Sequence, residues 1–378
     1  MRTVDLDRHY VLIILTAMLA GCGVLPFDST QGRLAQDDMQ PASAAHTDRL
    51  YLYSADCCGA LNSGGVKVYD PRPQQVVRRL IGGAQNPELV RLDGTGTLYV
   101  LNGSKAGPGG VAVSEFDQGG EKISRRVGHF YWARTFALDR TNRLYVANCN
   151  TCVDSGADPQ AKVLDSVTVY GFHRTQLLRT ITQGIHAPSS LAFDSSGSLY
   201  VSNGGVKGKN GSVTVYSPGS SRLRRTITRG IEHPGPLAID RSDDLFVSDS
   251  AGHGMGANEI VEFAPHSDSI LRTISDNVDG YLSLTLDGSG TLYVSSWPEE
   301  PSGAGWISVY APGSIKPAYI ITQKIDEPVS VALGGDGNLY VANDGGWTSV
   351  YAPGAKKPLR VVASGALGEP QSLAFGPR

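Results

Sequence analysis

The pattern of apolar and polar positions repeats along most of the chain, and its clearest element is a short run of the form Leu-Tyr-Val. The run or a near variant occurs seven times, beginning at Leu50, Leu98, Leu144, Leu199, Leu245, Leu292 and Leu339. Successive starts are 48, 46, 55, 46, 47 and 47 residues apart. A repeat of this length that is made of strands is typical of ring architectures in which each repeat forms one small sheet.

The fourth repeat shows most clearly how one unit divides into strands. Residues 190–194 form a short apolar strand, and a Ser-Ser-Gly turn leads to a second strand at 198–203. Residues 212–216 alternate strictly between apolar and polar, which predicts a third strand. Residues 223–228 alternate basic and apolar side chains, as an outer, half-exposed strand does. Each repeat is therefore predicted to be a four-stranded antiparallel sheet.

The two ends of the repeat region complement each other. The first unit starts at its second strand, near Arg49, and residues 371–375 supply a spare first strand. Residues 50–378 number 329, which is seven units of 47. We therefore expect an all-β, seven-bladed β-propeller in which the C-terminal strand completes the N-terminal blade. Closing the ring in this way removes open sheet edges between its ends.

The strand sequences also resemble a known group of proteins. Pro188 to Asp194 followed by Leu199 to Asn203, and Pro328 to Leu333 followed by Leu339 to Asn343, are similar to the units of NHL-repeat propellers and of the related bacterial Tyr-Val-Thr-Asn-type propellers. The resemblance covers nearly all of the repeat region and implies the same fold. It says little about function, because such propellers serve as enzymes, ligand binders and scaffolds.

The N-terminal segment has the character of an export signal. Its apolar run, residues 10–20, is too short to span a bilayer and has the length of a signal-peptide core. Leu19-Ala20-Gly21-Cys22 resembles the lipobox of bacterial lipoproteins, in which the cysteine carries acyl chains such as palmitate. The resemblance implies a signal peptide at 1–21, a lipidated flexible tether at 22–48 and a propeller at 49–378. An ordinary secretory signal with a chance cysteine, or a cytoplasmic protein with an apolar start, is the alternative.

Lipidation would place the protein outside the cytoplasm, anchored to the cell envelope. Gly23, rather than an aspartate, follows the cysteine, which by resemblance is compatible with the outer membrane of a Gram-negative cell. The formal net charge is −3, from 33 basic and 36 acidic residues, so no basic excess favours nucleic acid. We expect a monomer.

Candidate binding residues lie where the long loops gather on one face of the ring. The second strands end in Asn102, Asn148, Asn203, Asp249 and Asn343, which either surround the channel and bind a polar ligand or cap the strand ends. The segments that enter the first strands carry Glu88, His129, Trp132, Arg134, His186, His233, Tyr281, Glu327 and Glu369. His186 and His233 occupy matching places and are either acid–base or metal-binding groups or solvated loop side chains.

Four cysteines remain after Cys22, an even number suited to an oxidising compartment. We expect a Cys149–Cys152 disulfide and a vicinal disulfide between Cys57 and Cys58. A cross-loop pairing or a four-thiolate zinc site is the alternative.

No catalytic or cofactor motif is present in the sequence, so we expect no catalytic residue, cofactor or metal. The expected function is a binding or scaffold module for a protein or for a small polar or glycan ligand, on the loop-rich face. The rival is a lactonase-like propeller hydrolase or lyase that uses Glu88, His186, His233 and Asp249 at the channel mouth. At least three acids or histidines within about 5 Å of one point would favour the enzyme.

Overall fold

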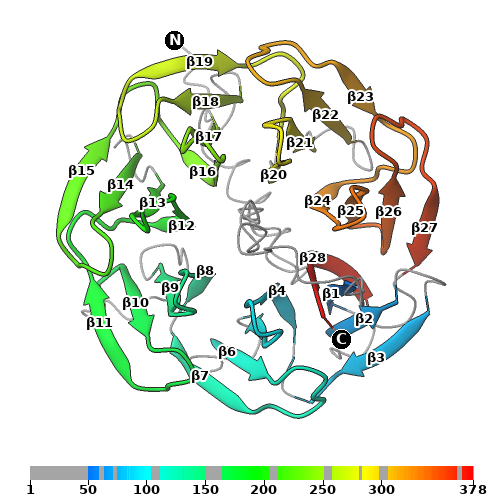
Figure 1. Ribbon diagram of the computed structural model, residues 1–378, viewed down its shortest axis with the longest axis horizontal. Coiled ribbons are helices and arrows are strands. Elements are labelled where there is room, and N and C mark those ends of the chain that lie inside the picture. The colour runs from blue at the N-terminus through cyan, green and yellow to red at the C-terminus, as the bar shows by residue number, and fades with distance from the viewer. Residues whose placement is uncertain are drawn as a thin grey trace, which may run out of the picture.

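The computed structural model describes residues 50–58, 64–70, 75–82, 84, 86–103, 111–130, 132–149, 164–204, 211–250, 258–280, 283–297, 305–363 and 368–377. Seven four-stranded sheets stand around one axis (Figure 1). All-antiparallel pairing within each sheet confirms the predicted seven-bladed propeller. In the described part of the chain, no helix has the length and apolar character needed to cross a membrane.

The four strands of each blade are named here in order from the axis outward. Blade 1 consists of β28 (Gly368–Gly376), β1 (Tyr51–Cys58), β2 (Gly65–Tyr69) and β3 (Val76–Leu80), and blade 2 of β4 (Pro87–Leu92), β5 (Leu98–Asn102), β6 (Val111–Phe116) and β7 (Arg125–Phe130). Blade 3 consists of β8 (Ala133–Leu138), β9 (Leu144–Asn148), β10 (Ser166–Tyr170) and β11 (Leu177–Ile181), and blade 4 of β12 (Pro188–Phe193), β13 (Leu199–Asn203), β14 (Ser212–Tyr216) and β15 (Leu223–Ile227).

The remaining three blades follow the same order. Blade 5 consists of β16 (Pro234–Ile239), β17 (Leu245–Asp249), β18 (Glu259–Phe263) and β19 (Ile270–Ile274). Blade 6 consists of β20 (Ser283–Leu286), β21 (Leu292–Ser296), β22 (Trp306–Tyr310) and β23 (Tyr319–Ile321), and blade 7 of β24 (Pro328–Leu333), β25 (Leu339–Asn343), β26 (Trp347–Tyr351) and β27 (Arg360–Ala363).

The apolar core lies between the blades. It forms seven clusters, and each combines side chains of two neighbouring blades. Tyr145 and Val169 of blade 3, for example, pack with Leu191 and Val201 of blade 4. Every residue of β13 is buried, because neighbouring blades cover both faces of this strand. The Leu-Tyr-Val repeat therefore marks the strands that are packed from two sides.

The ring closes where the two ends of the propeller meet. β28 pairs antiparallel with β1, from Tyr51 opposite Gly376 to Cys58 opposite Gly368. The Phe375 ring lies edge-on to Tyr340 of blade 7, with ring centroids 4.8 Å apart. The predicted completion of the first blade by the C-terminal strand is confirmed.

A side-chain network repeats at the turn between the first and second strands. In blade 4 the Asp194 carboxylate accepts hydrogen bonds from the backbone N–H groups of Ser196 (2.9 Å) and Ser198 (2.8 Å). The Tyr200 hydroxyl donates to Asp194 at 3.3 Å, and Arg225 of the outer strand donates to that hydroxyl at 3.3 Å. The aspartate that ends the first strand therefore holds the turn by accepting hydrogen bonds from its backbone.

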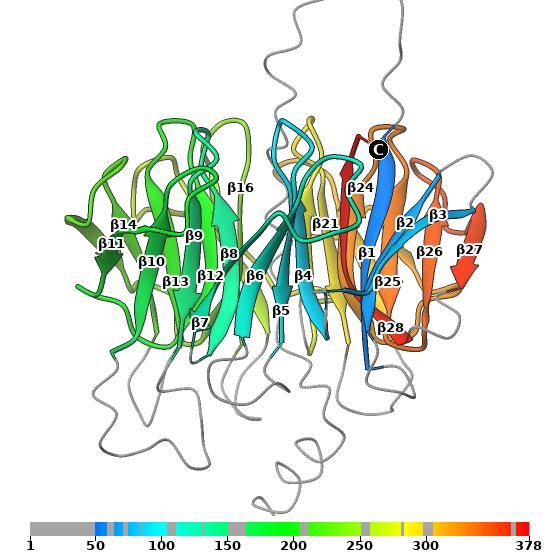
Figure 2. The ribbon, with the colours of Figure 1, turned by 90° about the horizontal axis from the view of Figure 1, so that it is seen from below.

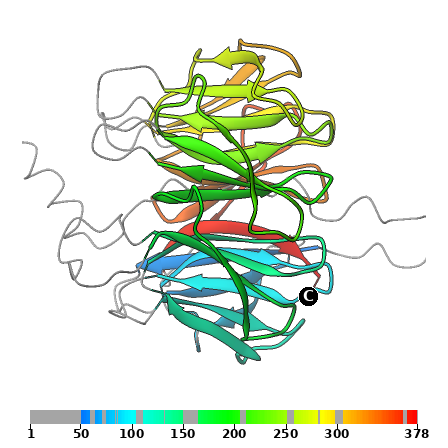
Figure 3. The same cartoon turned by 90° about the vertical axis from the view of Figure 1, so that its left-hand side faces the viewer.

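The ring has two different faces (Figure 2). The short-turn face carries the turns between first and second and between third and fourth strands, such as 194–198 and 217–222. On the long-loop face the second strands end and the third strands begin, as at Asn203 and Ser212, and the chain passes from each fourth strand to the next blade, as at 182–187. The C-terminal end of β28 lies at the short-turn face (Figures 2 and 3).

Candidate functional site

The innermost strands β4, β8, β12, β24 and β28 carry one extra residue each near the long-loop face. In β4, Pro87 pairs with Asn102 and Leu89 with Leu101, so Glu88 has no ladder partner. Arg134 in β8, Ser189 in β12, Val329 in β24 and Gln371 in β28 hold the equivalent positions. A bulge turns its extra side chain out of the ladder. The innermost strands border the axis of the ring (Figure 1), and we call the five extra residues, 88, 134, 189, 329 and 371, the bulge ring.

Glu88 and Arg134 bring opposite charges to neighbouring blades of the bulge ring. Burial raises the pKa of Glu88 to about 7, and the Arg134 guanidinium opposes that rise. Burial also lowers the pKa of Arg134, opposed by Glu88. A methyl group on Gly103 would collide with the Glu88 carboxylate, so glycine is required for Glu88 to lie there. The pair forms a polar, partly desolvated site at the long-loop ends of β4 and β8, the innermost strands of blades 2 and 3.

Three of the predicted second-strand residues hold the backbone of the incoming segment. Asn203 accepts a hydrogen bond from the His186 N–H at 2.9 Å, and Asn343 accepts one from the Asp326 N–H at 3.0 Å. In blade 5 the Asp249 carboxylate accepts from the backbone N–H groups of Glu232 (2.9 Å) and His233 (2.6 Å). These side chains fix the connection between two blades, and we call each such contact a latch. The acceptor oxygens that form the latches are already hydrogen-bonded within the fold.

The equivalent residues of blades 2 and 3 differ. The side-chain N–H groups of Asn102 donate to Ser114, and those of Asn148 donate to Thr168. The amide oxygens of both are buried and have no hydrogen-bond partner among the described residues. The amide oxygen of Asn86, two residues before Glu88, is also buried without a partner among the described residues. Buried acceptors without partners are uncommon and costly, so this concentration on two neighbouring blades marks a place where a ligand could donate hydrogen bonds.

The two predicted histidines lie at the entries to neighbouring blades and have different partners. His186 Nδ1 lies 3.6 Å from the Asp165 carboxylate of blade 3, whereas the His233 backbone N–H donates to Asp249 of blade 5. Among the residues that the structure describes, no three His, Cys, Asp or Glu side chains form a group that could hold a metal ion. Within the described residues, therefore, no metal-holding group supports the enzyme alternative.

Carboxylates accumulate elsewhere on the long-loop face. Burial raises the pKa of Glu259, and the Asp249 and Glu232 carboxylates raise it further. Burial also raises the pKa of Asp344, with smaller contributions from Glu327 and Asp326, while a hydrogen bond from Gln371 opposes the rise. Like charges that raise one another's pKa favour a positively charged neighbour.

A buried ion pair in blade 1 was not foreseen from the sequence. Lys67 Nζ lies 2.6 Å from the Asp56 carboxylate, and the two side chains are 1% and 0% exposed. Ser54 donates to the same carboxylate at 2.5 Å. Burial raises the pKa of Asp56 to about 6, although Lys67 opposes the rise. A lysine in the otherwise apolar run Gly65–Tyr69 was the available signal.

Several predicted residues lie wholly or partly outside the described residues. Cys22, Tyr281 and Cys152 are among the undescribed residues, and so are the side chains of Cys58 and His129. Cys57 and Cys149 are both disulfide-bonded. Their predicted pairing with Cys58 and Cys152 stays a prediction.

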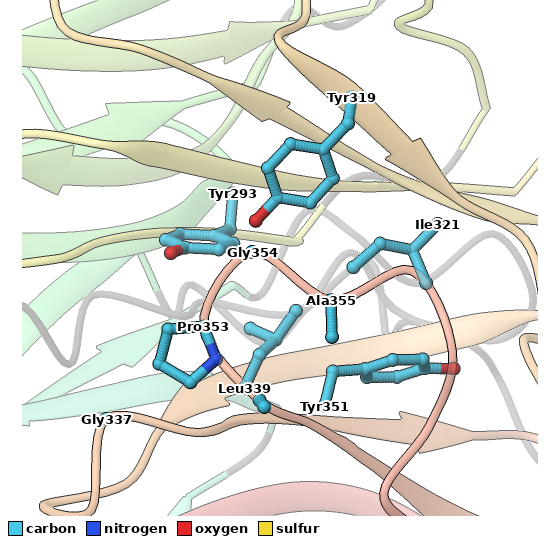
Figure 4. Close-up of a pocket in the computed structure, with 10 residues that line it drawn as sticks. Tyr293, Tyr319, Ile321, Gly337, Leu339, Tyr351, Pro353, Gly354 and Ala355 are labelled. Carbon is cyan, nitrogen blue, oxygen red and sulfur yellow. The ribbon is translucent and has the colours of Figure 1, made fainter.

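A narrow crevice separates blades 6 and 7 at the short-turn face (Figure 4). Tyr293 and Tyr319 of blade 6 face Leu339, Tyr351 and the turn at Pro353 of blade 7. Aromatic side chains, aliphatic side chains and backbone atoms line the crevice. The lining contains no acid or base that could transfer a proton at neutral pH.

The blade count, the strand order and the closed ring define the protein as a seven-bladed β-propeller. Among solved structures it is similar to the WD40 β-propeller domain of Doa1, with a TM-score of 0.58 and 10% sequence identity. The match covers 82% of this chain and 91% of that chain. At this identity the likeness concerns the fold alone. No protein-family model and no curated protein matches the sequence.

Proposed function

We propose that the protein is an exported lipoprotein, anchored to the cell envelope through Cys22, whose propeller is a binding module. The ligand is a donor-rich group with positive charge, presented by a protein partner or by a small polar or glycan molecule. It binds at the channel mouth of blades 2 and 3. The lipobox resemblance supports the anchor, and the chemistry of the long-loop face supports the ligand class.

One observation carries the ligand assignment: among the residues that the structure describes, the buried amide oxygens of Asn86, Asn102 and Asn148 have no hydrogen-bond partner, and all three belong to the long-loop ends of blades 2 and 3, where Glu88 also lies. All three free groups are acceptors, so a ligand must bring donors. Hydroxyl, ammonium and guanidinium groups supply donors, and the last two also lower the energy of an ionised carboxylate. The acids around Glu259 and Asp344 favour the same sign of charge.

A ligand screen against the purified full chain tests the binding proposal. Thermal stabilisation is measured with amines, basic peptides, neutral glycans and acidic peptides, and each hit is repeated with Glu88→Gln. Binding of basic or amine ligands that falls at least tenfold in Glu88→Gln supports the proposal. Glu121→Gln, an exposed acid on the short-turn face, is the matched control and keeps full binding. Preference for acidic ligands, or equal binding by both variants, would contradict it.

Mass spectrometry of the mature protein tests the anchor. We expect a new N-terminus at Cys22 that carries acyl chains, and a soluble exported form in Cys22→Ser. A full-length, unmodified N-terminus would refute export as a lipoprotein. Turnover of a lactone library that stops on metal chelation would instead support the hydrolase alternative.

A further inference from the structure

The described chain begins on the short-turn face, at the boundary between blades 7 and 1. Leu50 packs with Tyr340 and Phe375, and a methyl group on Gly335 would lie 2.6 Å from its side chain. Gly335 belongs to the turn between β24 and β25. Under the proposed function, the tether from Cys22 therefore joins the propeller on this face. Twenty-seven residues separate Cys22 from Leu50. A flexible chain of that length reaches about 30 Å, so under the proposed function the anchor would keep this face near the bilayer.

Two neighbouring turns on the same face have a distinctive composition. They are 311–318, between β22 and β23, and 352–359, between β26 and β27. Together they carry the exposed cations Lys316, Lys356 and Lys357 and contain no acidic residue. The corresponding turns of blades 2 and 5 contain acids, namely Asp117, Glu121 and Asp268.

The same two turns hold aliphatic side chains out in solvent. Ile315 is 53% exposed and Leu359 is 57% exposed. Exposed aliphatic groups flanked by lysines are the combination that inserts at the boundary between lipid headgroups and acyl chains. We call these five residues, 315, 316, 356, 357 and 359, the lysine–aliphatic patch.

The backbone fixes the patch in place. Ser314 donates a hydrogen bond to the Lys316 carbonyl at 2.7 Å, and Arg272 of blade 5 donates to the Ser314 carbonyl at 2.7 Å. The Leu359 N–H donates to the Val350 carbonyl at 2.7 Å. A hydrogen bond between the Tyr319 hydroxyl and the Gly354 backbone joins the two turns beside the crevice of Figure 4. A rigid patch loses little conformational entropy on binding.

We propose that the lysine–aliphatic patch is a membrane-docking surface that binds an anionic lipid bilayer, so that the short-turn face lies on the membrane and the long-loop face points away. The occupant is a bilayer because the tether joins the propeller on the same face as the patch, at blade 7, and because the patch combines positive charge with exposed apolar groups. The inference rests on the proposed lipid anchor for its orientation. It adds that the propeller itself contacts lipid.

Vesicle co-sedimentation of the full chain with Cys22→Ser tests the patch without the lipid anchor. The probe is a vesicle of phosphatidylcholine with about one third phosphatidylglycerol, compared with pure phosphatidylcholine at equal salt. Each lysine near an anionic surface contributes about fivefold to the partition coefficient, so Lys316→Gln/Lys356→Gln/Lys357→Gln lowers anionic vesicle binding about 100-fold. Ile315→Ser/Leu359→Ser lowers it independently of the lysines.

The matched control removes three exposed cations from the equivalent turns of blades 2 to 4, as Lys122→Gln/Arg174→Gln/Arg222→Gln. It changes the net charge equally, and we expect less than a threefold loss. Equal losses in the two triple variants, or no preference of the parent for anionic vesicles, would overturn the inference. The mass of the mature wild-type N-terminus separates the two proposals. Acylated Cys22 with a silent patch leaves the anchor standing alone, and an unmodified Cys22 with an active patch refutes the anchor while retaining the docking surface.

Discussion

Substituting Lys67 by methionine tests the energetic meaning of the buried pair in blade 1. Lys67 and Asp56 are 1% and 0% exposed and 2.6 Å apart. At an effective dielectric constant of about 20, two unit charges at this distance attract by about 6 kcal/mol. Most of that attraction offsets desolvation, so the pair itself adds little net stability. Removing one partner, however, leaves a buried charge without compensation and costs about 3–5 kcal/mol.

The pH dependence gives this prediction a sign. Burial already raises the pKa of Asp56 to about 6 in the wild type, and loss of Lys67 raises it further. A raised carboxyl pKa means that the folded state keeps its proton longer, so stability is present at low pH and is lost as the pH rises through that pKa. Lys67→Met should therefore cost about 4 kcal/mol at pH 8 and about 1 kcal/mol at pH 5, where Asp56 is protonated cheaply.

Urea unfolding at pH 5 and pH 8, followed by circular dichroism, measures both values. The double variant Asp56→Leu/Lys67→Met should come within about 1 kcal/mol of the wild type at pH 8, because no buried charge remains. Lys356→Met, an exposed lysine, is the control and should change the free energy of unfolding by less than about 0.5 kcal/mol. A Lys67→Met cost that is independent of pH, or as small as that of the control, would refute the reasoning.

Three other predictions concern closure, latching and the channel mouth. Phe375→Ala should lower the free energy of unfolding by about 3–5 kcal/mol, because Phe375 of the closing strand is 3% exposed and packs edge-on against Tyr340 of blade 7. A loss below about 1 kcal/mol in a denaturant titration would contradict that role. Asn203→Ala should cost about 1–3 kcal/mol and speed hydrogen exchange at the His186 amide, whereas Asn203→Asp should retain protection because Asp249 serves the same latch in blade 5; equal exchange in both variants would argue against the latch. Because the pKa of Glu88 is raised to about 7, the wild type should lose up to about 3 kcal/mol of its free energy of unfolding as the pH rises from about 4.5 to about 7. Glu88→Gln, which has no carboxyl group to ionise, should not show this loss. The same pH profile in both proteins would show that Glu88 titrates normally.

The architecture was readable from the sequence because each of its determinants is local and repeated. The Leu-Tyr-Val runs identify strands that are covered on both faces, and Asp194 with its turn serines forms hydrogen bonds within five residues. The incomplete first unit and the spare strand at 371–375 left one way to close the ring, and β28 pairs with β1 as expected. A repeated local pattern reports the fold reliably, since each copy tests the others.

The candidate site was only partly readable. The sequence identified the positions of Asn102, Asn148, Asn203 and Asn343. Their sequence contexts do not reveal that Asn203 and Asn343 accept a hydrogen bond from a backbone N–H, whereas the buried oxygens of Asn102 and Asn148 have no partner within the described part of the chain. Asn86 escaped notice because its relevance depends on packing beside Glu88 rather than on a motif.

By itself, then, the amino-acid order determined the number of blades, their strands and the way the ring closes, since all of these follow from short periodic patterns. Only the tertiary structure decided which polar groups meet. The register of β1 against β2 buries Asp56 with Lys67, and the bulges of β4 and β8 bring Glu88 and Arg134 to one mouth. Contacts between strands and blades depend on register and twist, which no single repeat encodes.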